Sequence, residues 1–151
     1  IAINTAKVAQ SFGYKPKVAM LSFSDFGEHR GLEEVQRVSK ALELINLAEP
    51  HLIVDGEVQA DTAVNADRAE ELFPFSKLQG SANVLIFPNL AAGNISYKLL
   101  SHLGGATAIG PLLVGLNKPL NVLALGSDVK DIVNITALTV MQAINLAKKR
   151  G

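Results

Sequence analysis

The sequence predicts an α/β protein with an open, mostly parallel sheet and helices on both faces of that sheet. Three short apolar runs carry this prediction, at residues 17–23, 52–56 and 82–88. Each is the length of a strand and precedes a longer segment whose apolar residues have helical spacing. Strands that alternate with helices form βαβ units, in which right-handed crossovers make the strands parallel. Continuous apolar runs also fit strands that are buried on both faces.

The clearest helix covers residues 31–48, where apolar residues recur every three or four positions and Pro50 ends the pattern. Residues 59–73 are expected to be helical with a break near Asn65, and residues 90–104 form a helix that ends at Gly104. The inner positions expected for the 31–48 helix are Leu32, Val35, Val38, Leu42 and Ile45.

The two ends of the chain also have helical spacing. Residues 1–12 predict a helix that Gly13 ends, and the absence of a capping residue before it suggests a piece of a longer polypeptide. Short strands are expected within residues 106–116 and 120–125, followed by a long helix from Ser127 to about Lys148. The inner positions expected for the first helix are Ile1, Ala2, Val8, Ala9 and Phe12.

The composition excludes several classes of function. Of 151 residues, 14 are basic and 14 acidic, so no net field favours nucleic acid or an anionic membrane. The chain has no cysteine, which excludes disulfides, thiolate metal sites and a cysteine nucleophile. No apolar run approaches the roughly 18 residues of a membrane span. A cytoplasmic protein without nucleic-acid or membrane partners is expected.

Three carboxylates, Asp55, Glu57 and Asp61, follow the second predicted strand. They are suited to holding a hard cation or to acid–base chemistry. The alternative is turn chemistry, because Asp-Gly favours a tight turn after a strand. We favour the turn, since no fourth ligand is evident and the three histidines lack metal-ligand spacing. No metal site is predicted.

Two candidate ligand-binding pairs lie where predicted strands end. Ser22 and Ser24 follow the first strand, and ligands of open α/β sheets bind at such ends. Gly93 and Asn94 lie in the first turns of the helix after the third strand, where a glycine costs helix stability and suggests close approach of a ligand. Turn formation by the serines and close packing at the glycine are equally good explanations.

A third candidate is the turn before the last helix, with Gly126 and Ser127 in the turn and Asp131 in the first helical turn. Backbone N–H groups and the helix dipole make such a place suitable for a phosphate. The residues before the glycine are Ala124 and Leu125, however, so neither an arginine nor a hydroxyl side chain is present there to bind a phosphate.

Several stretches together resemble the C-terminal part of the phosphate acetyltransferase fold, in the expected order: VAMLSFSDFG, LIVDGEVQAD, ANVLIFPNLAAGNISYKLL and AIGPLLVGLNKPLNVLALGSDVKDIVNI. FPFSKL and LALGS favour the variant found at the C-terminus of bacterial NADP-dependent malic enzymes. The resemblance implies a two-lobed protein of which residues 1–151 are one part. Residues 14–118 would form most of the second lobe, and residues 119–151 would return to a missing first lobe.

The resemblance also implies which residues matter. Transacetylases of this family carry a serine and an arginine before the glycine of the turn, and an aspartate in the helix. These positions are Ala124, Leu125 and Asp131 here, so only the aspartate is retained. An arginine would clamp the phosphate and neutralise its charge, which leucine cannot do. The resemblance therefore predicts no catalytic residue in this chain and no transacetylase activity.

The implied function is a regulatory and oligomerising part of an NADP-dependent malic enzyme that senses acetyl-CoA or CoA. An upstream domain of the same chain would carry out oxidative decarboxylation of malate to pyruvate with NADP and Mg or Mn. The expected partners are an acyl-CoA effector, that upstream domain and further copies in a homo-oligomer. Two alternatives remain open: an active phosphate acetyl- or butyryltransferase, and a purely structural assembly module.

Overall fold

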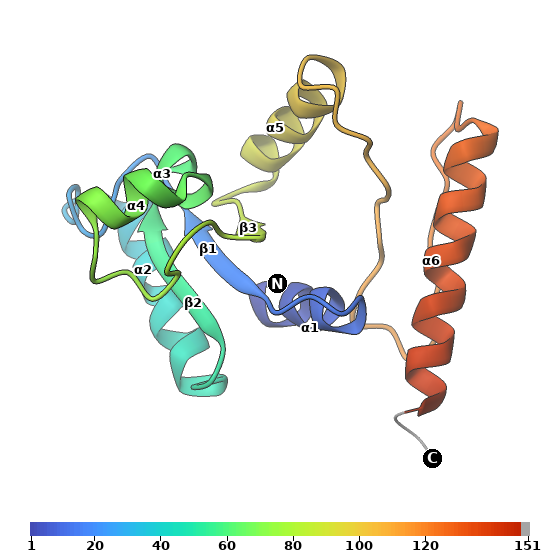
Figure 1. Ribbon diagram of the computed structural model, residues 1–151, viewed down its shortest axis with the longest axis horizontal. Coiled ribbons are helices and arrows are strands. Elements are labelled where there is room, and N and C mark those ends of the chain that lie inside the picture. Colours follow the sequence, from blue (N-terminus) through green and yellow to red (C-terminus); the bar gives the residue numbers. More distant parts are fainter. Residues whose placement is uncertain (149–151) are drawn as a thin grey trace.

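The computed structural model describes residues 1–148, and strand β1 (Lys17–Leu21) lies in the middle of its sheet. β2 (Ile53–Val58) and β3 (Val84–Ile86) pair with β1 on its two sides, both in parallel, which gives the order β2-β1-β3 (Figure 1). Val18 is the β1 residue that pairs with Val54 in β2 and with Val84 in β3. The predicted open parallel sheet is confirmed.

Side chains of β1 alternate between two apolar cores, one on each face of the sheet. Val18 and Met20 belong to the larger core, which is closed by α1 (Ala2–Ser11) and α2 (Glu33–Ala48). Ala19 and Leu21 belong to the other core, together with Ala63 of α3 (Ala60–Val64). Helices therefore cover both faces, as predicted, and β1 is buried on both sides as its continuous apolar run requires.

Two details of the helix predictions were wrong. Ile1 is 95% exposed, because α1 buries the face that carries Ala2 and Ala6, four residues apart. Leu32 is 49% exposed, because it is the N-cap of α2 and precedes the first helical turn. The remaining expected inner positions of α2 are buried or half-buried.

The break predicted near Asn65 separates α3 from α4 (Ala66–Leu72). Asn65 caps α4, because its Oδ1 accepts a hydrogen bond of 3.1 Å from the backbone N–H of Arg68. Asn89 caps α5 (Leu90–His102) in the same way, accepting from the N–H of Ala92 at 2.9 Å. Side-chain oxygens thus fix the starts of both helices.

The strands expected within residues 106–116 and 120–125 do not form. These residues run as a long irregular connection between α5 and the last helix (Figure 1), with one isolated antiparallel bridge between Leu112 and Asn121. A strand needs a ladder partner, and within residues 1–148 these segments join none of the three strands of the sheet. Asn121 stabilises the bridge by accepting from the Leu113 N–H at 3.0 Å.

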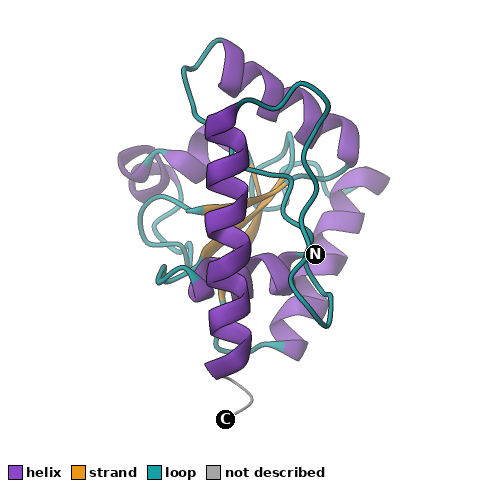
Figure 2. Cartoon of the chain, turned by 90° about the vertical axis from the view of Figure 1, so that its right-hand side faces the viewer, coloured by secondary structure: helices purple, strands orange, loops and turns teal. Residues whose placement is uncertain are grey.

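α6 (Val129–Lys148) stands apart from the sheet (Figure 1), and Figure 2 shows it from the outer side as the long vertical helix. Asn121 Nδ2 donates to Thr139 Oγ1 at 2.8 Å and to Gln142 Oε1 at 2.9 Å. The predicted closing helix is confirmed up to Lys148, where the described residues end. None of the helices described is both long and apolar enough to span a membrane. The division into lobes at residues 14–118 and 119–151 stays a prediction.

Candidate active site

The turn before α6 has the form that the sequence predicted. Gly126 has φ +88°, a conformation that glycine adopts without strain. Ser127 closes the turn twice, because its backbone N–H and its Oγ both donate to the carbonyl oxygen of Ala124, at 3.2 and 2.8 Å. The hydroxyl of Ser127 is therefore held next to the start of the helix.

α6 begins with a reciprocal pair of capping hydrogen bonds. Asp128 accepts from the N–H of Asp131 through Oδ1 at 2.8 Å, and Asp131 accepts from the N–H of Asp128 through Oδ2 at 3.1 Å. This is the arrangement of a capping box, with an aspartate in place of the usual glutamate. Asp131 is thus fixed in position, and its Oδ1 accepts no hydrogen bond from the residues that the structure describes.

A hollow of about 100 Å³ opens beside this turn. Ser127 and Asp131 line it together with Ala124, so three of the positions singled out in the sequence meet here. Leu125 does not, because its side chain is fully exposed and lies outside the hollow. The other lining residues come from α5, the connection after it and α6, and no sequence pattern predicted them: Tyr97, Ala108, Ile109, Gly110, Leu123 and Ile135.

The serines after β1 belong to a different place. Ser24 is buried, donates from Oγ to Glu57 Oε1 at 3.3 Å and accepts from the N–H of His29 at 3.1 Å. Ser22 Oγ accepts from the N–H of Ser24 at 3.4 Å. Both serines thus organise the loop after β1, and neither lines the hollow beside Asp131.

Gly93 and Asn94 also lie outside that hollow. A Cβ on Gly93 would be 3.6 Å from the Phe87 side chain, which is ordinary packing distance. Asn94 is exposed on α5. The contact with Phe87 therefore does not require a glycine at this position, because a Cβ would fit there.

The three carboxylates after β2 are engaged by protein donors. Asp55 accepts from Ser76 Oγ at 3.0 Å and from the Lys77 N–H at 2.7 Å, which ties the loop after α4 to the sheet. Glu57 accepts from Ser39 Oγ at 2.7 Å, and Asp61 pairs with Arg68 at 3.1 Å. Within residues 1–148, no group of three or more histidines and carboxylates is arranged to hold a metal ion.

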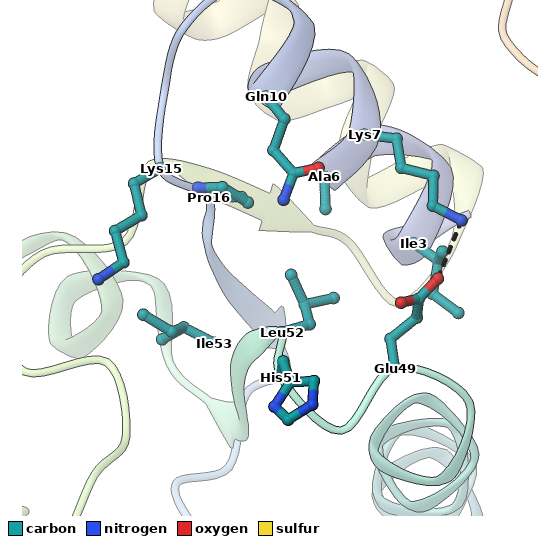
Figure 3. A pocket seen from close by; sticks show the side chains of 10 residues that line it. All are labelled: Ile3, Ala6, Lys7, Gln10, Lys15, Pro16, Glu49, His51, Leu52 and Ile53. Atoms are coloured by element: carbon teal, nitrogen blue, oxygen red, sulfur yellow. Dashed lines mark ion pairs between the residues drawn. The ribbon is translucent and has the colours of Figure 1, made fainter. Parts of the chain in front are cut away.

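A separate hollow of about 210 Å³ lies at the amino ends of β1 and β2 (Figure 3). An ion pair of 2.9 Å between Lys7 of α1 and Glu49 bounds one side, and the Gln10 side chain reaches in from the same helix. Lys15 extends away on the other side. Ligands of open α/β sheets bind at the carboxyl ends of the strands, so this hollow is not the candidate active site.

Comparison with known proteins identifies the fold and the family. Residues 1–140 match the phosphate acetyl/butaryl transferase family. A phosphate acetyltransferase of Staphylococcus epidermidis is 47% identical over 149 residues, which is 95% of this chain and 45% of that protein. The chain belongs to the phosphate acetyl/butaryl transferase family. It spans slightly less than half the length of the curated relatives it matches.

Solved structures of this family agree with the fold. The EutD phosphotransacetylase from Staphylococcus aureus superposes with a TM-score of 0.87 at 46% sequence identity. The match covers 94% of this chain and 44% of the EutD chain. A phosphotransacetylase from Streptococcus pyogenes superposes with a TM-score of 0.86 at 43% sequence identity. That match covers 95% of this chain and 43% of the Streptococcus protein. The predicted phosphotransacetylase-like fold is thus confirmed.

Membership of the phosphate acetyl/butaryl transferase family corrects the functional prediction. The chain was expected to be a regulatory part of a malic enzyme, an NADP-dependent oxidoreductase without transacetylase activity. That expectation was wrong, because relatives 47% identical over 95% of the chain are phosphate acetyltransferases. The alternative of an active transferase fits them better. The expectations of NADP, Mg or Mn, an acyl-CoA effector and homo-oligomers are not tested by these likenesses.

Proposed function

We propose that this chain is part of an active phosphate acyltransferase, which moves a short acyl group between phosphate and coenzyme A. The likeness that carries the proposal is the 47% identity to a phosphate acetyltransferase over 95% of the chain. The hollow beside the turn adds a site of suitable chemistry, because it joins a hydroxyl, a carboxylate and the start of a long helix.

The reaction makes one bond and breaks another. The thiol sulfur of coenzyme A attacks the acyl carbon of an acyl phosphate, a C–S bond forms, and phosphate leaves with the electron pair of the broken C–O bond. The thiol proton goes to a base, because the thiolate is the nucleophile. Asp131 fits the base, since the capping box holds its carboxylate at the edge of the hollow through Oδ2 and leaves Oδ1 for the proton.

Phosphate needs positive charge or N–H donors. The side chain of Leu125 supplies neither. We therefore assign phosphate binding to the first turn of α6, to Lys130 and to the part of the protein outside this chain. Val129 and Lys130 contribute N–H groups at the positive end of the helix dipole. The carboxylates of Asp128 and Asp131 reduce this attraction, which makes a further cation from elsewhere in the protein necessary.

Thioester formation by the purified full-length protein tests the proposal. Acetyl phosphate and butyryl phosphate are each mixed with coenzyme A, and the thioester is followed by absorbance. We expect turnover with at least one of them, and a fall in kcat of about 10²–10⁴ in Asp131→Asn, the range of a general base. Asparagine can still accept from the Asp128 N–H, so the helix start is kept.

Glu71→Gln is the matched control, because it removes an exposed carboxylate on α4, outside the hollow. Its kcat should equal that of the unmodified protein. No thioester from either acyl phosphate would refute the proposed activity. Turnover that Asp131→Asn leaves unchanged would refute only the role of Asp131.

A further inference from the structure

A larger cleft has a volume of about 730 Å³ and is lined in part by α2. In Figure 1, α2 lies at the end of the molecule away from α6. The cleft opens between the loop after β1, α2 from Val35 to Glu43 and the loop after α4, at the carboxyl end of β2. Ligand pockets typically have volumes of about 300–1,000 Å³, and this edge of the sheet is where α/β proteins bind ligands. We call it the Phe75 cleft, after the residue on its aromatic wall.

Two phenylalanines, Phe26 and Phe75, form the wall of the Phe75 cleft, and Phe73 supports them from outside it. Phe26 packs against Phe73 and Phe75, with ring centroids 4.9 and 5.1 Å apart. Phe75 lies edge-on to Phe26 and is 68% exposed, so much of its surface is open to a ligand. Phe26 has φ +43°, an unfavourable value for a bulky residue that costs about 1–3 kcal/mol and clusters at ligand sites.

Arg30 provides a positive charge at the same cleft. Its guanidinium rests directly on Gly27, because a Cβ added to that glycine would be 2.1 Å from Arg30 Nε. Lys40, the other cation of the lining, is paired with Glu43 at 2.7 Å. No carboxylate of residues 1–148 forms an ion pair with Arg30.

The buried carboxylate at the base of the cleft is already occupied by donors. Glu57 is 2% exposed and accepts from the N–H of Gly27, from Ser24 Oγ and from Ser39 Oγ. These hydrogen bonds give both carboxylate oxygens a donor, and they also fix the loop that carries Phe26 and Arg30. The cleft therefore joins an open aromatic surface to an arginine free to bind an anion, on a loop fixed by buried hydrogen bonds.

We propose that the Phe75 cleft binds a purine mononucleotide, separately from the acyl-transfer reaction. The planar base stacks on the exposed ring of Phe75, an interaction worth about 1–3 kcal/mol per base. The phosphate binds the guanidinium of Arg30, whose planar donors suit phosphate oxygens.

Calorimetric titration of the full-length protein with adenosine monophosphate tests this site. Adenosine and inorganic phosphate, titrated separately, distinguish base from anion, and each should bind at least about tenfold more weakly than the nucleotide. Arg30→Gln and Phe75→Ala should each weaken the nucleotide by about tenfold or more, and Phe75→Tyr should keep its affinity. Arg37→Gln is the control, because Arg37 is an exposed arginine of α2 that pairs with Glu33 at 3.0 Å outside the cleft.

Coenzyme A also contains an adenine nucleotide, so a second titration is made with coenzyme A at saturation. Unchanged affinity for the mononucleotide supports a separate site. Complete displacement, with a matching rise of the KM for coenzyme A in Arg30→Gln, would make the cleft part of the substrate site and overturn the proposal. Absence of binding, or binding that Arg30→Gln and Phe75→Ala leave intact, would also overturn it. Binding needs no turnover, so failure of the proposed acyl transfer is a distinct result.

Discussion

Asn145, near the end of α6, donates a hydrogen bond of 2.8 Å from Nδ2 to the backbone carbonyl oxygen of Ser11, the last residue of α1. The two residues are 134 positions apart in the chain. α1 packs on the sheet, so this bond ties the helix of the candidate active site to the main core. The placement of Asp131 thus depends on a contact at the opposite end of α6.

Replacing Asn145 by alanine should loosen α6 from α1. The change leaves the half-buried carbonyl of Ser11 without its donor, and a cost of about 1 kcal/mol in the free energy of unfolding is expected. Urea denaturation of the full-length protein measures it. Asn94→Ala, on the exposed face of α5, should cost nothing measurable. Equal stability of the two variants would mean that α6 is held by other contacts.

Removing the charge of Glu57 should destabilise the loop after β1. In Glu57→Gln, an NH2 group replaces one acceptor oxygen, either the one that accepts from Ser24 and the Gly27 N–H or the one that accepts from Ser39. Such a buried mismatch costs about 2–3 kcal/mol. The midpoint of urea denaturation should fall accordingly, while Glu71→Gln, which changes an exposed carboxylate, leaves it in place. A midpoint unchanged by Glu57→Gln would contradict the network.

The capping box of α6 predicts a graded response at Asp128. Asp128→Ala removes the acceptor for the Asp131 N–H and should cost about 1 kcal/mol, whereas Asp128→Asn keeps a good cap. Hydrogen exchange of the amides in the first turn of α6 reports this directly. Faster exchange in the alanine variant alone is the expected pattern. Similar exchange in both variants would show that the cap does not stabilise the turn.

Restoring a cation to the turn should strengthen phosphate binding. Leu125→Arg places a guanidinium beside Ala124 at a fully exposed position, where it causes no clash. We expect the KM for phosphate, measured in the direction of acyl phosphate synthesis, to fall by about tenfold. Leu103→Arg adds the same charge at the exposed C-cap of α5 and is the control. An equal effect of both variants would indicate a general effect of charge.

The layered core could be predicted from the sequence because its signals are local. The apolar run from Lys17 predicts a strand buried on both faces, and the spacing around Val35 predicts the helix that covers one of them. The break at Asn65 was also predictable, because asparagine is a favourable cap. Each of these features depends on residues that are close together in the sequence.

Other features depend on partners that the local sequence does not name. Residues 106–116 and 120–125 have the composition of strands, yet without an adjacent ladder only the bridge at Leu112 forms. Asp131 was identified through a family pattern, but its bond to Asp128 and the contribution of Tyr97 to the hollow arise from the fold. The Phe75 cleft was missed, because its wall and its cation come from separate loops.

The order β2-β1-β3 also bears on how the protein is made. Of these three strands β1 leaves the ribosome first, and both of its edges then await partners that are translated later. Pairing with β2 can begin once residue 58 has emerged, and β3 closes the other edge about thirty residues further on. For an interval of synthesis, the nascent chain therefore exposes one unpaired edge of β1, an apolar strand, and this is the stage at which a chaperone would be most useful.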